Sequence, residues 1–526
     1  MNFKTFVFIF SLGYVSGYKI LMIAPHSIRS LNILGVAYVR HLLNAGHEVT
    51  YVSPFPLRDK LKNFTQIDLS TTNSEFWSAD AEANIGYLIS KPLCEDTDPY
   101  YIQTTSTEVA EAMLQNTEMK ALLDDPTVKF DAVICDYVET EIYAALAAYY
   151  ECPMIWAYSL GAHWFTLRLV DGTTNPAHSS DYLSPDVPPL HSMAERVNKL
   201  WLQIKWNYYK WFKTVPREKS YYEKTFAPLF SNKNKPLPNY YELMYNASLV
   251  LANDFPGNGL IPSTPQNFIF IGVNKPANIF ILSIRCPQQL KTLLDNATNG
   301  FIYFSMGSLW KGKDVPKNVT KGLVDLFGSL KQTVIWKYEE YLPNLPKNVH
   351  TLKWAPQQSI LAHPKCLFFI SHGGLLSTTE SVHFGVPTIG IPLYFDQFNN
   401  VNRGVLAGRT IKVDLTINLV TDLRVAVQKM LRDSSYKQRA KEVSKIYHDR
   451  PVSPGAELVH WVEHVVRTRG APHLRSPALM LPWYQNMYID VILVCLAMTL
   501  LIGWLCKKYL FASLRRKLGN KKEKRN

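Results

Sequence analysis

The feature that most constrains this chain is a long apolar run close to its C-terminus. Residues 489–506 are almost all apolar, and the charge of Asp490 stands at the edge of the run. A helix rises about 1.5 Å per residue, so residues 487–506 would cover about 30 Å, the thickness of one bilayer core. The sequence therefore predicts one transmembrane helix at 487–506, with a large body before it.

A basic tail follows the apolar run. From Lys507 to the C-terminus there are nine Lys or Arg residues and one Glu, so the tail carries +8 of the formal net charge of +13. Because basic residues favour the cytosolic side of a span, we expect the tail, 507–526, in the cytosol. The body is nearly neutral, so the basic balance of the whole chain does not indicate a nucleic-acid-binding protein.

The N-terminus has the pattern of a secretory signal peptide. Lys4 precedes an apolar stretch at residues 6–12, and Val15 and Gly17 satisfy the rule for small residues around a cleavage site. A signal peptide at 1–17 and one span near the other end predict a single-pass type I protein. Its body would then lie in a secretory lumen.

Two further patterns fit this topology. Lys522 and Lys524 stand fifth and third from the end, as in the dilysine signal that retrieves membrane proteins to the endoplasmic reticulum. Four Asn-X-Ser/Thr sequons precede the span, at Asn63, Asn246, Asn296 and Asn318. We therefore expect a glycoprotein of the endoplasmic reticulum membrane, glycosylated where a sequon lies on a surface loop.

The body has the composition of a large globular protein. Of the 526 residues, 47% are hydrophobic and 19% charged, which excludes a disordered chain. Seven Cys without a CxxC pair exclude a disulfide-rich scaffold. Short apolar runs alternate with helical patterns, as in 19–24, 34–45 and 48–53, and the alternation restarts at residue 301. This pattern predicts an α/β protein with two Rossmann-like domains facing a cleft.

We expect the first domain at 18–280 and the second, with trailing helices, at 281–470, followed by a membrane-proximal linker at 471–486. Residues 196–230 interrupt the first domain with a helical, basic and very aromatic stretch. This stretch is either a packed helical excursion with an aromatic core face, or a hydrophobic lid or a surface for the membrane interface. The two interpretations can coexist.

The chemistry is concentrated in residues 354–397. A buried strand ends near Ser371, and His372, Gly373 and Gly374 form the turn into a helix. Glycines at such a turn let backbone N–H groups approach an anion, and the helix N-terminus adds about half a positive charge. The pattern predicts a diphosphate site to which His372 can donate a hydrogen bond.

The same segment offers partners for the rest of a nucleotide sugar. Glu380 lies about two helical turns along the same face and can accept from ribose hydroxyls. Trp354 offers a flat face to a base, and Gln357 adds an amide one turn on. Asp396 and Gln397 follow the next strand, where they can hold sugar hydroxyls.

This segment resembles the signature of the UDP-glycosyltransferases, the membrane-bound conjugating enzymes of animals, and the resemblance covers nearly the whole chain. SHGGLLSTTE and residues 175–185 look most like arthropod members. The resemblance implies a GT-B type fold, with the acceptor on the first domain and the UDP-sugar, UDP-glucose by arthropod likeness, on the second. It adds Ser308 and Ser377 to the nucleotide contacts. Leu376 departs from the Asn of many vertebrate members, so one phosphate contact is lost.

The resemblance implies no cofactor besides the UDP-sugar co-substrate. No metal is needed, because helix and backbone donors can stabilise the leaving UDP. Asp96 and Asp98 resemble a metal-binding DxD pair, but they lie in a Pro-flanked stretch without a preceding strand, and we interpret them as a turn.

The catalytic base is where this sequence departs from the family. Members use a His after the first strand, oriented by a carboxylate, to take the acceptor proton. Alignment places Leu31 at that position, and Leu31 cannot accept a proton. His26, five residues earlier, either replaces it or is a polar loop residue. The orienting carboxylate is Asp136 by vertebrate spacing or Glu141 by arthropod spacing; either could instead be only a charge at a helix N-terminus.

Two functions follow. One is an inverting transferase that moves a hexosyl group to a hydroxyl of small lipophilic compounds, as in detoxification. The other is a donor-binding pseudoenzyme, or a regulatory partner of active relatives, because Leu31 stands in for the base. The expected partners are the UDP-sugar, a lipophilic acceptor, the membrane and related transferases in a homo- or hetero-oligomer.

Overall fold

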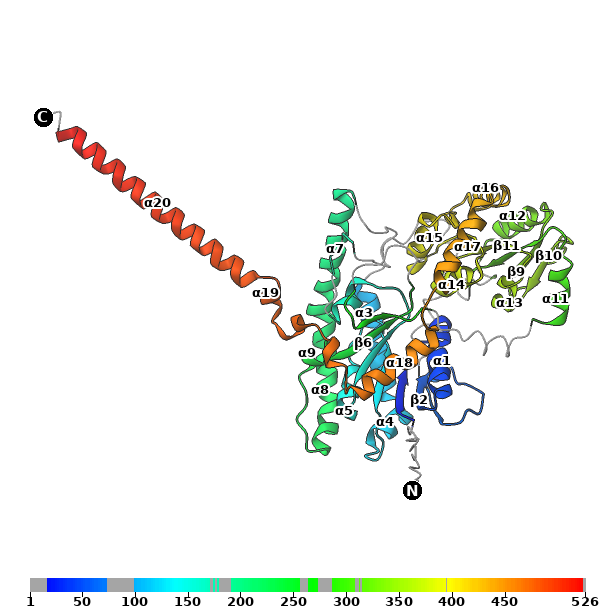
Figure 1. Cartoon of the computed structure of the whole chain (residues 1–526), viewed down its shortest axis with the longest axis horizontal. Helices are drawn as coiled ribbons and strands as arrows, with labels where there is room; N and C mark the ends of the chain where they lie inside the picture. The colour runs from blue at the N-terminus through cyan, green and yellow to red at the C-terminus, as the bar shows by residue number, and fades with distance from the viewer. Residues whose placement is uncertain are drawn as a thin grey trace, which may run out of the picture. The chain divides into compact units, whose positions relative to one another are not determined.

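The computed structural model describes residues 17–72, 99–170, 174–175, 177–178, 191–255, 264–272, 286–307, 312, 315–393 and 395–523. Two parallel sheets lie within the unit that ends at Leu474, and residues 475–526 form a separate unit (Figure 1). The predicted signal peptide, except Gly17, lies outside the described residues, as do Ser308, Asp96, Asp98 and the expected domain boundary at 280.

The first sheet has seven parallel strands in the order β3-β2-β1-β4-β5-β6-β7. The strands are β1 (Lys19–Ile23), β2 (Glu48–Ser53), β3 (Phe64–Asp68), β4 (Ala132–Asp136), β5 (Met154–Tyr158), β6 (Ala247–Ala252) and β7 (Phe268–Phe270). β4, β5 and β6 are buried along their whole length, as in a parallel sheet covered on both faces. Strand order reverses at β1, so a crevice opens at the carboxyl ends of β1 and β4.

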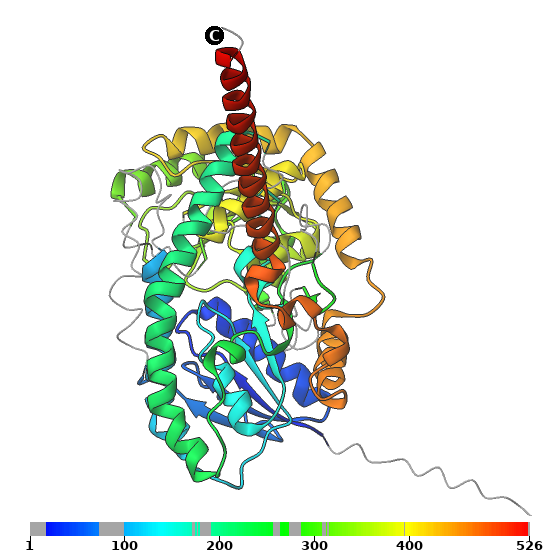
Figure 2. The same cartoon turned by 90° about the vertical axis from the view of Figure 1, so that its left-hand side faces the viewer.

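Nine helical segments accompany this sheet among the described residues. They are α1 (Arg29–Asn44), α3 (Pro99–Gln115), α4 (Thr117–Asp124), α5 (Ala144–Tyr150), α6 (Trp164–Arg168), α7 (Met193–Tyr209), η1 (Lys210–Thr214), α8 (Val215–Asn232) and α9 (Tyr240–Leu243). η1 is a single π-helical stretch, and α7, η1 and α8 run on as one long helical arm (Figure 2). This arm is the helical stretch expected at 196–230.

The second sheet has six parallel strands in the order β10-β9-β8-β11-β12-β13. The strands are β8 (Phe301–Ser305), β9 (Thr333–Lys337), β10 (Val349–Leu352), β11 (Cys366–Ser371), β12 (Thr388–Gly390) and β13 (Thr410–Lys412). Its helices are α11 (Gln288–Asp295), α12 (Lys317–Gly328), α13 (Gln357–Leu361), α14 (Leu375–Phe384), α15 (Asp396–Leu406), α16 (Leu419–Arg432) and α17 (Ser435–His448). The two sheets confirm the predicted α/β class.

The chain then returns to the first sheet. Helix α18 (Pro454–Arg467) contacts α1, beside which it lies in Figure 1. Leu458 and Val462 share one hydrophobic core with β1 and β2. The expected range 281–470 therefore includes a helix that packs with the first sheet, because its apolar face is buried there.

Two buried contacts join the halves near this return. Arg403 of α15 forms an ion pair with Asp254 at 3.2 Å, and both side chains are buried. The rings of Phe255 and Tyr447 meet edge to face, with centroids 4.7 Å apart. These contacts place the carboxyl ends of the two sheets around one cavity.

Residues 475–526 contain one helix long and apolar enough to cross a membrane. Three helices follow η3 (Pro472–Leu474) in the chain: η4 (Pro477–Met480), α19 (Trp483–Asn486) and α20 (Ile489–Glu523). The candidate span is Ile489–Ser513, with a mean hydropathy of 2.5, and no part of its apolar window is buried. The predicted span at 487–506 falls on this segment, although α20 continues into the basic tail.

Helix α1 begins earlier than its hydrophobic pattern indicates. The sequence predicted a helix from residue 34, but α1 starts at Arg29, after Ile28 in extended conformation. The first-turn residues up to Ile33 are not fully buried, and the buried face begins at Leu34. Ser30 and Leu31 therefore belong to a helical turn rather than a loop.

Candidate active site

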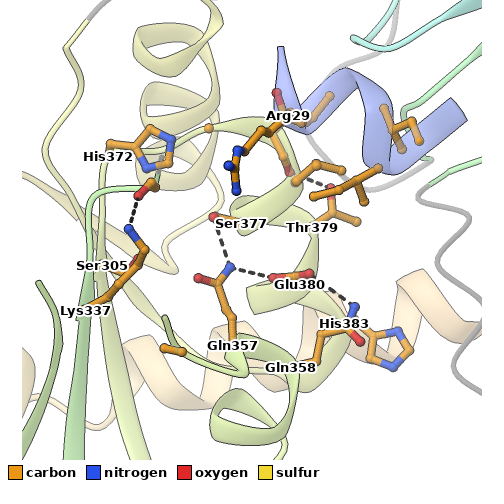
Figure 3. Close-up of a pocket in the computed structure, with 18 of the residues that line it drawn as sticks. Arg29, Ser305, Lys337, Gln357, Gln358, His372, Ser377, Thr379, Glu380 and His383 are labelled. Atoms are coloured by element: carbon orange, nitrogen blue, oxygen red, sulfur yellow. Dashed lines mark hydrogen bonds between the residues drawn. The ribbon is translucent and has the colours of Figure 1, made fainter. Parts of the chain in front are cut away.

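A cavity of about 510 Å³ lies between the two sheets. Figure 3 shows part of its lining. The first half of the chain contributes the start of α1 and the loop after β5, through Arg29, Ser30, Leu31, Ile33, Leu34, Ser159 and Leu160. The second half contributes the ends of β8 and β9, helices α13 and α14, and the start of α15. The cavity is therefore built from elements far apart in the sequence.

The N-terminus of α14 opens into this cavity. β11 ends at Ser371, Gly373 adopts a φ of +83°, and Gly374 precedes the first helical residue without a side-chain cap. Leu375, Leu376 and Ser377 line the cavity, so the first turn of the helix faces it. N–H groups at a helix start attract anions, and this turn has the geometry expected of a phosphate site.

His372 is held in a narrow space between two glycines. A Cβ on Gly307 would lie 2.6 Å from the His372 ring, and a Cβ on Gly374 only 2.5 Å from it, so a larger residue at either position would displace the ring. Burial, helped by the charge of Lys337, lowers the pKa of His372 to about 4. The neutral ring can therefore donate a hydrogen bond to an anion but brings no charge.

Two cations that the sequence analysis did not single out complete this corner. Lys337 ends β9, and its Nζ donates to the carbonyl of Gly307 at 2.9 Å and pairs with Glu339. Arg29 opens α1, and Figure 3 shows its guanidinium pointing into the cavity. The sequence offered one signal for Lys337, which is a cation at the carboxyl end of a predicted strand. It offered none that linked Arg29 to the segment 354–397.

Glu380 is positioned by two amides. Its Oε2 accepts from Gln357 Nε2 at 2.5 Å and its Oε1 from Gln358 Nε2 at 3.2 Å (Figure 3). Gln357 also donates to Ser377 Oγ at 3.1 Å and accepts from the Tyr303 hydroxyl at 3.2 Å. Because this network fixes the carboxylate before any ligand enters, it can accept from a diol without reorganisation.

The remaining predicted donor residues lie on the same wall. Trp354 is 58% exposed and lines the cavity, and Lys337 Nζ lies 5.9 Å from the centre of its ring. Asp396 and Gln397 begin α15 and also line it. Burial raises the pKa of Asp396 to about 6, and the amide of Asn400, which donates to Asp396 at 2.6 Å, limits the rise. The structure thus gathers the described members of the predicted donor set around one cavity, except that Gly373, in the turn before α14, does not line it.

The first-domain side of the cavity carries an apolar side chain, Leu31, at the position predicted for the catalytic base. Leu31 lines the cavity, whereas His26 is buried and does not. Burial lowers the pKa of His26 to about 4, and neither ring nitrogen has a hydrogen-bond partner among the described residues. The geometry does not bring His26 to the position of a substrate.

Of the two candidate carboxylates, Asp136 lies nearer the cavity. Asp136 ends β4 and lines a small void together with Leu31, Leu34 and Ser159, which also line the main cavity. Burial raises its pKa to about 8, so the group is mostly protonated at neutral pH. Leu31 and Leu34 lie between this void and the main cavity, because they line both.

Glu141 belongs to a different cluster. It is fully buried and accepts from the Tyr137 hydroxyl at 2.8 Å, from Arg168 at 3.3 Å, and from Lys210 of the helical arm. Burial by itself would raise the pKa of Glu141, but Lys210 and Arg168 outweigh it and hold the pKa below its usual value. Glu141 does not line the cavity and ties the helical arm to the first sheet.

Among the described residues, no group of three His, Cys, Asp or Glu side chains could hold a metal ion. The groups at the cavity that can attract an anion are the α14 N-terminus, His372, Lys337 and Arg29. Together with the Glu380 network and the exposed indole of Trp354, these groups give the second-half wall of the cavity donors for an anion, a positioned carboxylate and an aromatic side chain.

Comparisons with known proteins agree with this geometry. A family model described as UDP-glucoronosyl and UDP-glucosyl transferase matches residues 18–525. UDP-glucosyltransferase 2 of Dactylopius coccus is 29% identical over 508 residues, covering 94% of this chain and 93% of its own length. UDP-glucuronosyltransferase 2B1 of Rattus norvegicus is 25% identical over 509 residues and covers 92% of each chain.

Solved structures share the fold. The calicheamicin glycosyltransferase CalG4 superposes with a TM-score of 0.54, covering 87% of this chain and 100% of its own, at 18% identity. The glycosyltransferase VinC, solved with dTDP, gives a TM-score of 0.54 at 16% identity and covers 86% of this chain and 99% of its own. At these identities the likeness concerns the fold alone, and it confirms the two-domain GT-B architecture.

Proposed function

Because the chain belongs to the UDP-glucuronosyl and UDP-glucosyl transferase family, we propose that it binds UDP-glucose in the cavity and transfers the glucosyl group to a hydroxyl of a small lipophilic compound. The observation that carries this proposal is the Glu380 network beside the α14 N-terminus. The glucosyl donor is supported by the Dactylopius coccus relative, whose name is that of a glucosyltransferase.

In this proposal the second half of the chain holds the donor. The uracil stacks on Trp354, and the ribose hydroxyls donate to Glu380. The diphosphate accepts from the first-turn N–H groups of α14 and from His372, while Lys337 and Arg29 offset its charge. Asp396 and Gln397 hold sugar hydroxyls. As the bond from the anomeric carbon to UDP breaks, the same donors stabilise the leaving diphosphate.

The acceptor attacks from the first-half side, on the opposite face of the sugar, and the configuration inverts. Its hydroxyl must lose a proton as the new bond forms. Leu31 lines this wall, and of the described first-half residues that line the cavity only Arg29 is ionisable. We therefore propose acceptors whose hydroxyl is already acidic, since Arg29 can attract their anion while no first-half carboxylate or imidazole is needed.

A donor-binding protein without transfer activity is the second candidate. Leu31 in place of a base, and the protonated Asp136 behind it, favour this alternative. The decisive experiment uses the detergent-solubilised full chain: calorimetry with UDP, and UDP-glucose turnover with a panel of phenols. Binding with turnover supports the enzyme, binding without turnover supports the second candidate, and no binding at millimolar UDP would contradict both.

We further propose a type I protein of the endoplasmic reticulum membrane with its body in the lumen. Support comes from the candidate span Ile489–Ser513 and from the four sequon asparagines, which are all exposed. Protease protection of sealed microsomes tests the orientation, and glycosidase treatment tests the sugars. A body digested without detergent would contradict the lumenal topology.

A further inference from the structure

The helical arm carries large apolar side chains on a face that no other described part of the protein covers. Eight of them are exposed along α7 and η1: Met193, Val197, Leu200, Trp201, Ile204, Tyr208, Trp211 and Phe212. They recur at intervals of three and four residues, which places them along one side of a helix. We refer to these eight residues as the apolar stripe.

The polarity of this helix is the reverse of that of an ordinary surface helix. Met193, Trp201 and Phe212 are 75%, 63% and 69% exposed, whereas Lys199 and Lys210 are 2% and 0% exposed. A surface helix normally turns its apolar side to the core and its lysines to water. A contiguous exposed apolar surface of this kind marks an interaction site.

The buried side of the arm is fixed, so the apolar stripe cannot turn inward. Lys210 forms ion pairs with Glu141 and Glu218, both fully buried. Gln203 donates to the carbonyl of Thr174 at 2.8 Å. Rotating the arm would leave these charges buried without partners, which is strongly destabilising.

The composition of the stripe and its margins fits a lipid interface. Trp201, Tyr208 and Trp211 are of the residue types enriched where membranes meet water. Arg196, Lys205 and Lys213 of the same arm supply positive charge of the kind that anionic headgroups attract. A second copy of the same stripe would instead bring these like charges together.

The chain also keeps the body close to a membrane. The body ends at Leu474 and the candidate span begins at Ile489. The residues between them, 475–488, can extend at most about 50 Å. We propose that the apolar stripe inserts into the interface of the bilayer in which α20 is anchored, an inference that rests on the membrane anchoring proposed above.

The test separates the stripe from the anchor. The full chain, with a protease recognition sequence inserted between residues 475 and 482, is reconstituted into vesicles of phosphatidylcholine and phosphatidylserine. After cleavage, the fraction of the body that sediments with the vesicles is measured. We expect most of the wild-type body to sediment with the vesicles. For the W201E/F212E variant, the fraction of the body in the pellet should be at least fivefold lower.

The matched control is V425E/I446E, on α16 and α17, because Val425 is as exposed as Trp201. This control body should sediment like the wild type. UDP binding by each released body checks its fold, and the single changes Trp201→Glu and Phe212→Glu are used if the double variant fails that check.

Four outcomes would overturn the inference. The first is that cleavage releases the wild-type body from the vesicles although the intact chain binds them. This result would leave the anchoring proposal standing. The second is a W201E/F212E body that stays with the vesicles, because another surface then holds it. The third is a wild-type body released as a dimer, which would assign the stripe to a second copy. An intact chain absent from the vesicles would overturn the anchoring proposal and this inference with it.

Discussion

The two walls of the cavity differ in how completely they are equipped. On the second-half wall, Glu380 is held by two glutamines and His372 is fitted between two glycines. On the first-half wall, Leu31 and Leu34 cover a protonated Asp136, and His26 is buried away from the cavity. In the proposed function, donor binding and proton removal therefore depend on separate walls, and one wall can be complete while the other is not.

Leu31→His should have the largest effect, because it would supply the group that the first-half wall lacks. An imidazole at this position would face the cavity and lie beside Asp136. General-base catalysis typically contributes about 10²–10⁴-fold, and we expect a gain of that order in kcat/KM with weakly acidic phenols. Steady-state kinetics of the full chain measure it.

The matched control is Ile33→His, which places an imidazole on the same cavity wall but not beside Asp136. It should give little gain, and Asp136→Asn should remove most of the gain from Leu31→His. Equal gains from both histidines would show that the Leu31 position is not special.

Glu380→Gln should come next in size and act only on the donor wall. It removes the charge that accepts from the ribose, and hydrogen bonds to a charged group are worth about 1.5–3 kcal/mol, so UDP affinity should fall about 10- to 100-fold. Calorimetry measures the affinity. Glu442→Gln on α17, which is half-buried and does not line the cavity, is the control and should leave the UDP affinity unchanged.

A further prediction concerns the pH dependence of stability. The pKa of Asp136 is about 8 in the folded protein, above the ordinary value of about 4 that it regains on unfolding. Between these two pH values the folded state holds a proton that the unfolded state releases. The free energy of unfolding should therefore fall as the pH rises from about 4 to about 8.

The side chain of the Asp136→Asn variant does not titrate in this range. Its free energy of unfolding should therefore change less between pH 4 and pH 8 than that of the wild type. Thermal unfolding of the two proteins at several pH values measures the difference. The stabilisation of the variant relative to wild type should grow toward pH 8. A difference that stays constant with pH would mean that Asp136 is ionised in the folded protein.

The fold class and the donor wall could largely be predicted from the sequence because their signals are local. The turn at Gly373 and Gly374, and the helix that carries Glu380, lie within one strand–turn–helix stretch. Arg29 could not be found in this way, because α1 is far from this stretch in the sequence, whereas Lys337 had the local signal of a cation at the end of β9. The short strands β3 and β13 have too few apolar residues to give a clear pattern.

The first-half wall shows where alignment by spacing fails. Spacing left both Asp136 and Glu141 as candidates, the first by vertebrate and the second by arthropod spacing, and the structure places Asp136 at the end of β4 and Glu141 after it. Their environments depend on partners remote in sequence: Glu141 is held by Lys210 of the arm, whereas Asp136 lines a void shared with Leu31, Leu34 and Ser159. Local sequence carries no information about those partners.

The central claim is that the chain has a complete donor wall and lacks a base on the acceptor wall. The most direct test measures kcat/KM of the wild-type chain with saturating UDP-glucose and phenols of graded pKa. We predict UDP binding together with turnover that falls steeply, by about tenfold or more, from acidic phenols to weakly acidic ones at pH 7. Rapid turnover that is equal for acidic phenols and aliphatic alcohols would contradict the account, because it would require a base on the wall where the structure places Leu31.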